Sequence, residues 1–215
     1  KNFQEPKMII FGAGGFAKEI LEVLSQNSLD SNVVFFDNVS NVKNNLMYDK
    51  FKIIYSTQDL LFEVENSKYS SCIIGVGTSK NREYAYNYIN NLGIEIKTLI
   101  SKNAIIGRYK VNIGEGTCIM ALSQITSNVS IGKGCLINKS TVISHDVCIG
   151  NFCDIAPSSN LLGYVKIGDR CEIGSGAIIL PGITIGSNCK IGAGAVVTKD
   201  VPDNSTVIGI PARGV

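Results

Sequence analysis

The stretch IGKGCLINKSTVISHDVCIGNFCDIA, residues 131–156, carries an aliphatic residue at every sixth position. The same spacing runs without a break from Ile113 to Val197. Neither an α-helix nor a strand that alternates between two faces produces a period of six. Self-similarity at a fixed short period is the signature of solenoid folds. We therefore predict a solenoid in the second half of the chain.

Two further features of the repeat predict its shape. A small or β-branched residue stands four positions after each aliphatic one, as Thr117 does after Ile113, and glycine often follows the aliphatic residue directly. Glycine permits the backbone angles of a tight corner. Three six-residue units then close one triangular coil, and coils stack about 4.8 Å apart as ordinary neighbouring strands do. Residues 101–215 are predicted to form this parallel β-helix, with Ile100 and Ile106 as an incomplete first coil, one residue out of step.

Four of the seven cysteines are spaced by 18 residues, which is the length of one predicted coil; they are Cys135, Cys153, Cys171 and Cys189. The chain has no CxxC pair and a single histidine, so a zinc site has poor support. We interpret these cysteines as small buried residues along one inner edge, and we expect no metal and no disulfide.

Composition limits the partners of the chain. The net charge is +2, and there is no basic run interleaved with aromatic residues, which argues against nucleic acid. No stretch reaches 18 uninterrupted apolar residues, and the N-terminus lacks a signal-peptide pattern. We expect a cytoplasmic protein that does not bind a membrane.

Residues 1–100 have a different rhythm. The buried strand KMII is followed directly by FGAGGFAKEI, in which Gly12, Gly14 and Ala17 fit the pattern G-x-G-x-x-G/A. Further strands are predicted in NVVFFDN, FKIIYS and SCIIGVG, and a helix is predicted from Thr78 or Ser79 to a stop at residue 93. Strands that alternate with helices predict a small Rossmann-like α/β domain with a parallel sheet.

The glycine motif predicts a ligand. A diphosphate can approach the helix N-terminus at Gly12, Gly14, Gly15 and Phe16, and Asp37 ends the second strand where a ribose hydroxyl would lie. A dinucleotide needs two such halves, and fewer than 100 residues supply about one. We therefore favour a nucleoside diphosphate over NAD; NAD, and a glycine turn that only joins strand to helix, remain alternatives.

A short Rossmann-like domain followed by a hexapeptide repeat resembles one group of bacterial acetyltransferases, and INKSTVISHD is the stretch that carries the resemblance. The members are nucleotide-amino-sugar N-acetyltransferases, and close relatives are sialic acid O-acetyltransferases. The resemblance implies a left-handed β-helix, a homotrimer with active sites between neighbouring prisms, and acetyl-CoA as co-substrate without a metal. It also implies a role in polysaccharide biosynthesis.

Within INKSTVISHD, the resemblance implies that His145 is the catalytic base, that Asp146 orients it and that Asn138 contacts the sugar. The repeat supports part of this independently. His145 follows the inward Ile143 by two residues, which puts it at an outward corner, and Gly163 lies 18 residues on, one coil above. A glycine there lets a substrate approach the backbone, and its N–H can face an oxyanion.

The remaining site residues are weaker expectations. Ser79 and Arg82 open the helix after GVG and are expected to help hold the base or the phosphates. Asp154 stands where many relatives have a second histidine, and we expect it near the thioester. Coenzyme A is expected to touch corner residues and the tail, with a lysine on a phosphate; the residues are Gly174, Ser175, Gly176, Ala193, Gly194 and Lys199.

These observations lead to one functional hypothesis and its rivals. The chain is expected to transfer acetyl directly from acetyl-CoA to the amine of a UDP-, dTDP- or GDP-linked amino-deoxy sugar. Sialic acid O-acetylation is the enzymatic alternative, and it would leave the first domain with less need to hold a nucleotide. A solenoid that acts only as a scaffold is the alternative from a different class.

Overall fold

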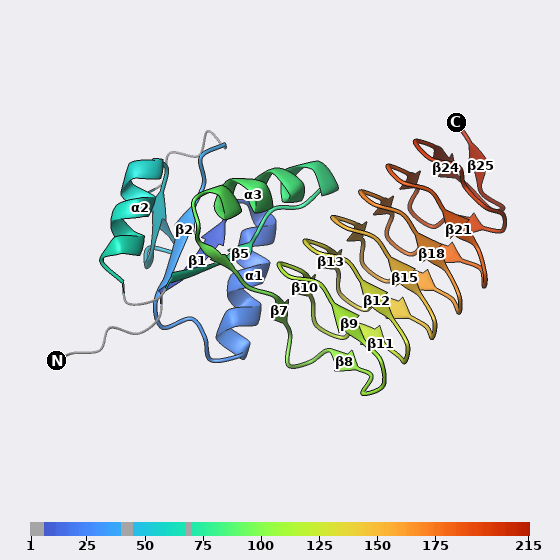
Figure 1. The fold of residues 1–215 in the computed structure, drawn as a ribbon, viewed down its shortest axis with the longest axis horizontal. Coiled ribbons are helices and arrows are strands. Elements are labelled where there is room, and N and C mark those ends of the chain that lie inside the picture. Colours follow the sequence, from blue (N-terminus) through green and yellow to red (C-terminus); the bar gives the residue numbers. More distant parts are fainter. Residues whose placement is uncertain (1–6, 40–44, 68–69) are drawn as a thin grey trace.

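The computed structural model describes residues 7–39, 45–67 and 70–215. An α/β part comes first in the chain and a triangular β-prism follows it (Figure 1). Within the described ranges, no helix is both long enough and apolar enough to cross a bilayer.

The α/β part is built on a six-stranded sheet in the order β3-β4-β2-β1-β5-β6. Every neighbouring pair is parallel except β3 with β4. The predicted parallel sheet is therefore confirmed, with one antiparallel edge strand. The strands are β1 (Lys7–Phe11), β2 (Val33–Phe36), β3 (Leu46–Met47), β4 (Phe51–Ile54), β5 (Ser70–Ile74) and β6 (Glu95–Ile96).

Helices cover both faces of this sheet. Helix α1 (Gly15–Gln26) packs on one face, while α2 (Thr57–Glu65) and α3 (Ser79–Asn91) pack on the other (Figure 1). Helix α1 buries Ala17, Ile20, Leu21 and Leu24, as its apolar spacing predicts. The sequence pattern does not predict helix α2, in which Leu60 is the only fully buried residue.

The second part is the predicted parallel β-helix, made of two-residue strands on three faces. The first face contains β7 (Leu99–Ile100), β10 (Cys118–Ile119), β13 (Leu136–Ile137), β16 (Asp154–Ile155), β19 (Glu172–Ile173), β22 (Lys190–Ile191), β24 (Thr206–Ile208) and β25 (Arg213–Gly214). The second face contains β8 (Ile105–Ile106), β11 (Gln124–Ile125), β14 (Val142–Ile143), β17 (Asn160–Leu161), β20 (Ile178–Ile179) and β23 (Val196–Val197). The third face contains β9 (Asn112–Ile113), β12 (Ser130–Ile131), β15 (Cys148–Ile149), β18 (Lys166–Ile167) and β21 (Thr184–Ile185).

The coils keep the register that the repeat predicts. Ile125 pairs with Ile143 and Ile143 with Leu161, each 18 residues on, and these side chains are almost fully buried. The first coil is longer, because Ile106 pairs with Ile125, which lies 19 residues on. The expectation of a first coil one residue out of step is therefore confirmed. Strands β24 and β25 close the far end as an antiparallel pair.

The cysteine column behaves as buried filler. Cys135, Cys153, Cys171 and Cys189 have no exposed surface, and their thiols donate to carbonyls of the following coil at 2.9–3.1 Å. Burial raises the pKa of Cys189, which disfavours its thiolate form. In the described part of the chain, no cluster of three or more His, Cys, Asp or Glu side chains could hold a metal ion.

The α/β part packs against the first face of the prism. Leu99, Cys118 and Leu136 of the prism belong to the same apolar cluster as α1, and Phe152 belongs to the cluster of α3. The ring of Tyr86 on α3 meets the ring of Phe152 edge-on at 5.4 Å. We call this contact region the seam.

Candidate functional site

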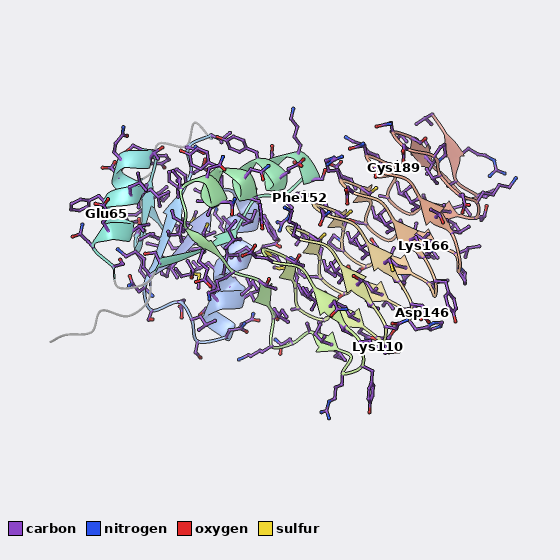
Figure 2. The ribbon with its side chains drawn as sticks, viewed as in Figure 1. Glu65, Lys110, Asp146, Phe152, Lys166 and Cys189 are labelled. Carbon is purple, nitrogen blue, oxygen red and sulfur yellow. The ribbon has the colours of Figure 1, made fainter. Side chains whose placement is uncertain are left out.

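His145 lies on the edge between the second and third faces, which we call the His145 edge. Strand β14 ends at Ile143, whose side chain is buried, and the chain turns two residues later at His145. The His145 side chain is 55% exposed. Figure 2 labels its neighbour Asp146 along the lower edge of the prism, whereas Phe152 lies on the other side, beside α3.

A carboxylate orients the imidazole. Nδ1 of His145 lies 2.7 Å from Oδ2 of Asp146, and the other carboxylate oxygen accepts a hydrogen bond from the side-chain amide of Asn128. The Asn128 amide and then His145 lower the pKa of Asp146, which favours its ionised form. An ionised carboxylate can only accept, so the proton of neutral His145 sits on Nδ1. Nε2, which has no partner among the described residues, carries the free lone pair.

Gly163 lies directly against the imidazole, as the 18-residue spacing predicts. A Cβ added to Gly163 would lie 2.7 Å from Cε1 and 2.9 Å from Nε2 of His145, so any other residue there would displace the imidazole ring. Within the described chain, the Gly163 N–H has no hydrogen-bond partner. The site therefore offers a base and an unused donor side by side, which is the pair that acyl transfer requires.

Lys199 lies further along the same edge. Strands β14, β17, β20 and β23 are stacked in register, and Lys199 follows Val197 by two residues as His145 follows Ile143. The lysine is exposed and lies three coils from His145, about 14 Å at the ordinary strand spacing.

Asn138 lies on a different edge, between the first and second faces, which we call the Asn138 edge. Its side-chain oxygen accepts the Lys139 N–H at 2.8 Å, and Lys139 forms an ion pair of 2.9 Å with Glu19 of α1. The corner residues expected to contact coenzyme A lie further along this edge; they are Gly174, Ser175, Gly176, Ala193 and Gly194. Within one chain, the structure does not bring Asn138 and His145 together.

The α/β part has a hollow of about 370 Å³ where several parallel strands end. Asp37 follows β2 and lies on its wall, and the carboxylate accepts the backbone N–H of Ala13 at 2.8 Å. The glycine turn therefore borders the hollow. The residues that line it are Phe11, Asp37, Val39, Val76, Lys80, Asn81 and Tyr84.

The glycine turn is open where a diphosphate is expected. Gly12 has a φ of +108°, and a Cβ there would lie 2.8 Å from Val76, so only glycine fits. Gly14 and Gly15 are exposed, and a Cβ added to either would meet nothing within 4 Å. Phe16 is half-buried beside them. This end of α1 has no side-chain cap, which leaves its N–H groups available to an anion.

Arg82 and Ser79 lie elsewhere than expected. Arg82 is fully buried in the seam, and its guanidinium donates to five backbone carbonyls. Two lie at the end of β5 and just after it, and three lie in the prism; these are Ile74, Val76, Gly116, Gly134 and Cys135. Ser79 is buried as well, and its hydroxyl donates to the Arg170 carbonyl at 3.3 Å. The Arg82 donors are used inside the protein, and neither Arg82 nor Ser79 lines the hollow of the α/β part.

Asp154 faces the seam from the first face. It lines a groove of about 290 Å³ that extends to Gly174 on the Asn138 edge, so the structure brings these two predicted residues together. One oxygen of Asp154 is buried without a hydrogen-bond partner in the described chain. Burial raises the pKa of Asp154 and Glu172 acts in the same direction, while Arg82 opposes them.

Sequence reasoning missed residues at both sites. Lys80, Asn81 and Tyr84 face the hollow from the first turns of α3, and the pattern of α3 gave no signal for this face because its buried side is itself partly polar. Asn128 and Tyr164 contact the His145–Asp146 pair, and both could have been found by stepping 18 residues from Asp146.

The hollow and His145 lie on opposite sides of one chain. The α/β part covers the first face, and the His145 edge is formed by the other two faces, away from it (Figure 2). Within one chain, the hollow and His145 therefore do not open onto a common cleft.

Two family models match the chain, one in each part. The family described as PglD N-terminal domain matches residues 7–89, and the family described as Bacterial transferase hexapeptide (six repeats) matches residues 164–199. The chain is an acetyltransferase with a PglD-type N-terminal domain and a hexapeptide-repeat region. One matched segment lies in the α/β part of this acetyltransferase and the other in the second half of its prism. No curated protein matches the chain.

Solved structures match over nearly the whole length. The acetyltransferase domain of PglB from Neisseria gonorrhoeae FA1090 is 28% identical with a TM-score of 0.86, and the match covers 97% of this chain and 99% of that one. PerB from Caulobacter crescentus, solved in complex with CoA and GDP-perosamine, is 28% identical with a TM-score of 0.87 and 100% coverage of both chains. WeeI from Acinetobacter baumannii AYE is 29% identical with a TM-score of 0.86, covering 98% and 100%.

Proposed function

We propose that this acetyltransferase moves the acetyl group of acetyl-CoA to the amine of a nucleotide-linked amino-deoxy sugar, with His145 as general base. The observation that carries the proposal is the arrangement at the His145 edge. The Asp146 carboxylate fixes Nδ1, while Nε2 and the Gly163 N–H are both left without a partner. The bound ligands named for PerB, CoA and GDP-perosamine, support the substrate class.

The proposed reaction is a direct transfer. The sugar amine attacks the thioester carbonyl while its proton passes to Nε2 of His145. Asp146 stabilises the resulting imidazolium, and the Gly163 N–H donates to the oxyanion of the tetrahedral intermediate. The C–S bond then breaks, and the coenzyme A thiolate leaves and takes up a proton. General-base catalysis of this kind typically contributes about 10²- to 10⁴-fold.

The two predicted domains divide the work in this proposal. Residues 1–100 hold the nucleotide, with its diphosphate on the turn Gly12–Phe16 and Asp37 near the ribose or base. Residues 101–215 carry the transfer chemistry. Lys80 and Asn81 replace Ser79 and Arg82 as the residues of α3 that reach the nucleotide, because they line the hollow.

We further propose a homotrimer in which each active site is shared. One chain supplies the α/β hollow and Asn138, which lie on the same side of the prism, and its neighbour supplies His145. Coenzyme A then lies between the two prisms, along Gly174–Gly176, Ala193 and Gly194 of one chain, with Asp154 in the adjoining groove. Lys199, on the edge of His145, meets a phosphate. Because acetyl-CoA is an intracellular thioester, we assign the reaction to the cytoplasm, in the assembly of a surface polysaccharide.

A panel of acceptors tests the proposed function. Acetyl-CoA is mixed with UDP-, dTDP- and GDP-linked amino sugars and, separately, with sialic acid, and free thiol is measured. Release with one nucleotide-linked amine supports the proposal, and release with sialic acid alone overturns it in favour of O-acetylation. Absence of thiol release with every acceptor, together with no binding of acetyl-CoA, favours a scaffold.

Thermal-shift measurements with UDP, dTDP, GDP, CMP and NAD identify the nucleotide independently of turnover. Ligand that binds only the folded state raises the melting temperature. Stabilisation by one nucleoside diphosphate and not by NAD is expected. Light scattering in the same buffers gives the number of chains in the assembly.

A further inference from the structure

A stack of three side chains surrounds His145, and two of its members have no role in the function proposed above. Asn128, Asp146 and Tyr164 occupy the same corner position on three successive coils, each 18 residues apart. All three have left-handed backbone angles, with φ of 57°, 62° and 65°. Backbone bonds join the coils at this corner, because the Tyr164 N–H donates to the His145 carbonyl at 3.1 Å.

Asn128 acts on the carboxylate and not on the imidazole. Its amide donates to Oδ1 of Asp146, and Oδ2 of Asp146 receives the Nδ1–H of His145 at 2.7 Å. The two oxygens of Asp146 are thus held from opposite partners. A carboxylate with both oxygens fixed cannot rotate away from the imidazole. Asn128 therefore positions Asp146, and Asp146 in turn positions His145.

Tyr164 acts on the ring itself. Its ring centroid lies 5.2 Å from that of His145, with the planes at 85°, which is an edge-to-face contact. Gly163 also lies in close contact with the imidazole. A single hydrogen bond at Nδ1 would leave the exposed imidazole free to swing about that bond, and the aromatic contact together with Gly163 removes this freedom.

We propose that Asn128 and Tyr164 are positioning residues that hold Nε2 of His145 in line with the incoming amine, Asn128 through Asp146 and Tyr164 through the imidazole ring. This inference rests on the proposed function, in which His145 is the base. The titratable groups in direct contact are Asp146 and Tyr164. The nearest charged side chains along the edge are Arg108 and Lys110, two coils away, and then Lys199 and Asp200, three coils away by the 18-residue spacing.

The first test reads the imidazole without any substrate. His145 is the only histidine in the sequence, so an untagged, ¹⁵N-labelled protein gives a single set of imidazole signals. The neutral wild-type ring is expected to carry its proton on Nδ1. In Asn128→Gly, which keeps the left-handed corner without strain, we expect a mixture of the two tautomers. Asn188→Gly is the matched control, because Asn188 has a φ of 58° on another edge and also uses its amide in hydrogen bonds.

An Asn128→Gly protein with the wild-type tautomer would overturn the role of Asn128.

The second test measures turnover with acetyl-CoA and the acceptor that is fastest in the panel. We expect Asn128→Gly to lower kcat about 10-fold with little change in the KM for acetyl-CoA, because it loses a hydrogen bond to a charged group. Tyr164→Asn, which also tolerates the corner angle, should lower kcat about 3- to 10-fold, and Tyr164→Phe should recover most of that loss because it restores the ring.

The outcomes separate this inference from the function on which it rests. A fully active His145→Asn protein would remove the base and the proposed function with it. An inactive His145→Asn protein beside Asn128→Gly and Tyr164→Asn proteins with wild-type kcat would leave the base in place and overturn the positioning roles alone.

Discussion

The seam and the His145 edge use polar side chains in opposite ways. In the seam, Arg82 is fully buried and its donors all go to backbone carbonyls. On the edge, the His145 side chain is 55% exposed, and both its Nε2 and the neighbouring Gly163 N–H lack a partner within the described chain. A polar side chain whose donors are all used in hydrogen bonds stabilises the fold. A side chain that is fixed by one hydrogen bond and has another polar atom without a partner is available for chemistry.

The largest effect on activity is expected when the imidazole of His145 is removed. His145→Asn should lower kcat/KM by about 10²- to 10⁴-fold, since it removes the proposed general base. Because the side chain is exposed and outside the core, the melting temperature should move by no more than about 2 °C. Steady-state kinetics and a thermal melt on the same sample check both halves.

Lys166→Ala on the third face serves as the control for this variant, as it removes an exposed side chain of the prism. A large loss of stability in His145→Asn would mean that the edge is structural after all. Undiminished turnover would show that the base lies elsewhere.

The converse experiment is made in the seam. Arg82→Met keeps the length of the side chain but removes five hydrogen bonds and leaves the carbonyls of Val76, Gly116 and Gly134 unpaired, which should lower the free energy of unfolding by about 3 kcal/mol or more. Arg170→Met is the matched control, because Arg170 lies on the same seam but is 40% exposed in a 3.6 Å pair with Glu83. The control should cost about 1 kcal/mol or less. Equal losses of unfolding free energy in urea titrations of the two proteins would show that the buried hydrogen bonds of Arg82 do not stabilise the fold.

Gly163→Ala tests the close contact on the edge. The added methyl would overlap the His145 ring at 2.7 Å, so the ring must move. A displaced base should lower kcat by about 10²-fold, with a smaller effect on the KM for acetyl-CoA. Wild-type kcat would mean that the ring finds its working position without contact with this glycine.

The smallest expected effect is a gain. Asp154 has a raised pKa because it is buried, so the folded protein resists its ionisation and loses stability as pH rises through that pKa. Asp154→Asn removes this penalty and should add about 1 kcal/mol at neutral pH. The gain should vanish below about pH 3.9, where the carboxyl is neutral in the unfolded chain as well. Glu95→Gln, which breaks an exposed pair with Lys97 in the α/β part, should give no such gain in urea titrations at either pH.

The prism was predictable because its period dictates which residues point inward. The positions of Ile143, His145 and Gly163 follow from that period alone, and the structure matches each of them. The extra residue of the first coil could also be counted from Ile106 to Ile113. A short period leaves little freedom, since a shift of one residue would turn the whole aliphatic column outward.

The α/β part and the seam were less predictable for physical reasons. Helix α2 buries only Leu60 completely, so its sequence has no apolar stripe strong enough to detect. Helix α3 buries Arg82 and Tyr86 because the prism covers them, and nothing local in the sequence says which face another domain will cover. The same contact misled the assignment of Arg82, as an arginine near a helix N-terminus suggests a phosphate ligand until its donors are located.

Stacked coils make length a countable quantity in this enzyme. His145 and Lys199 are separated by three coils of about 4.8 Å each, so the distance between them is set by a whole number of coils. Gain or loss of one complete 18-residue unit between them would keep the aliphatic column inward and change the span by a single step. Addition or removal of whole coils would thus fit the proposed site to a longer or shorter acyl carrier, without any change to the residues of the interior.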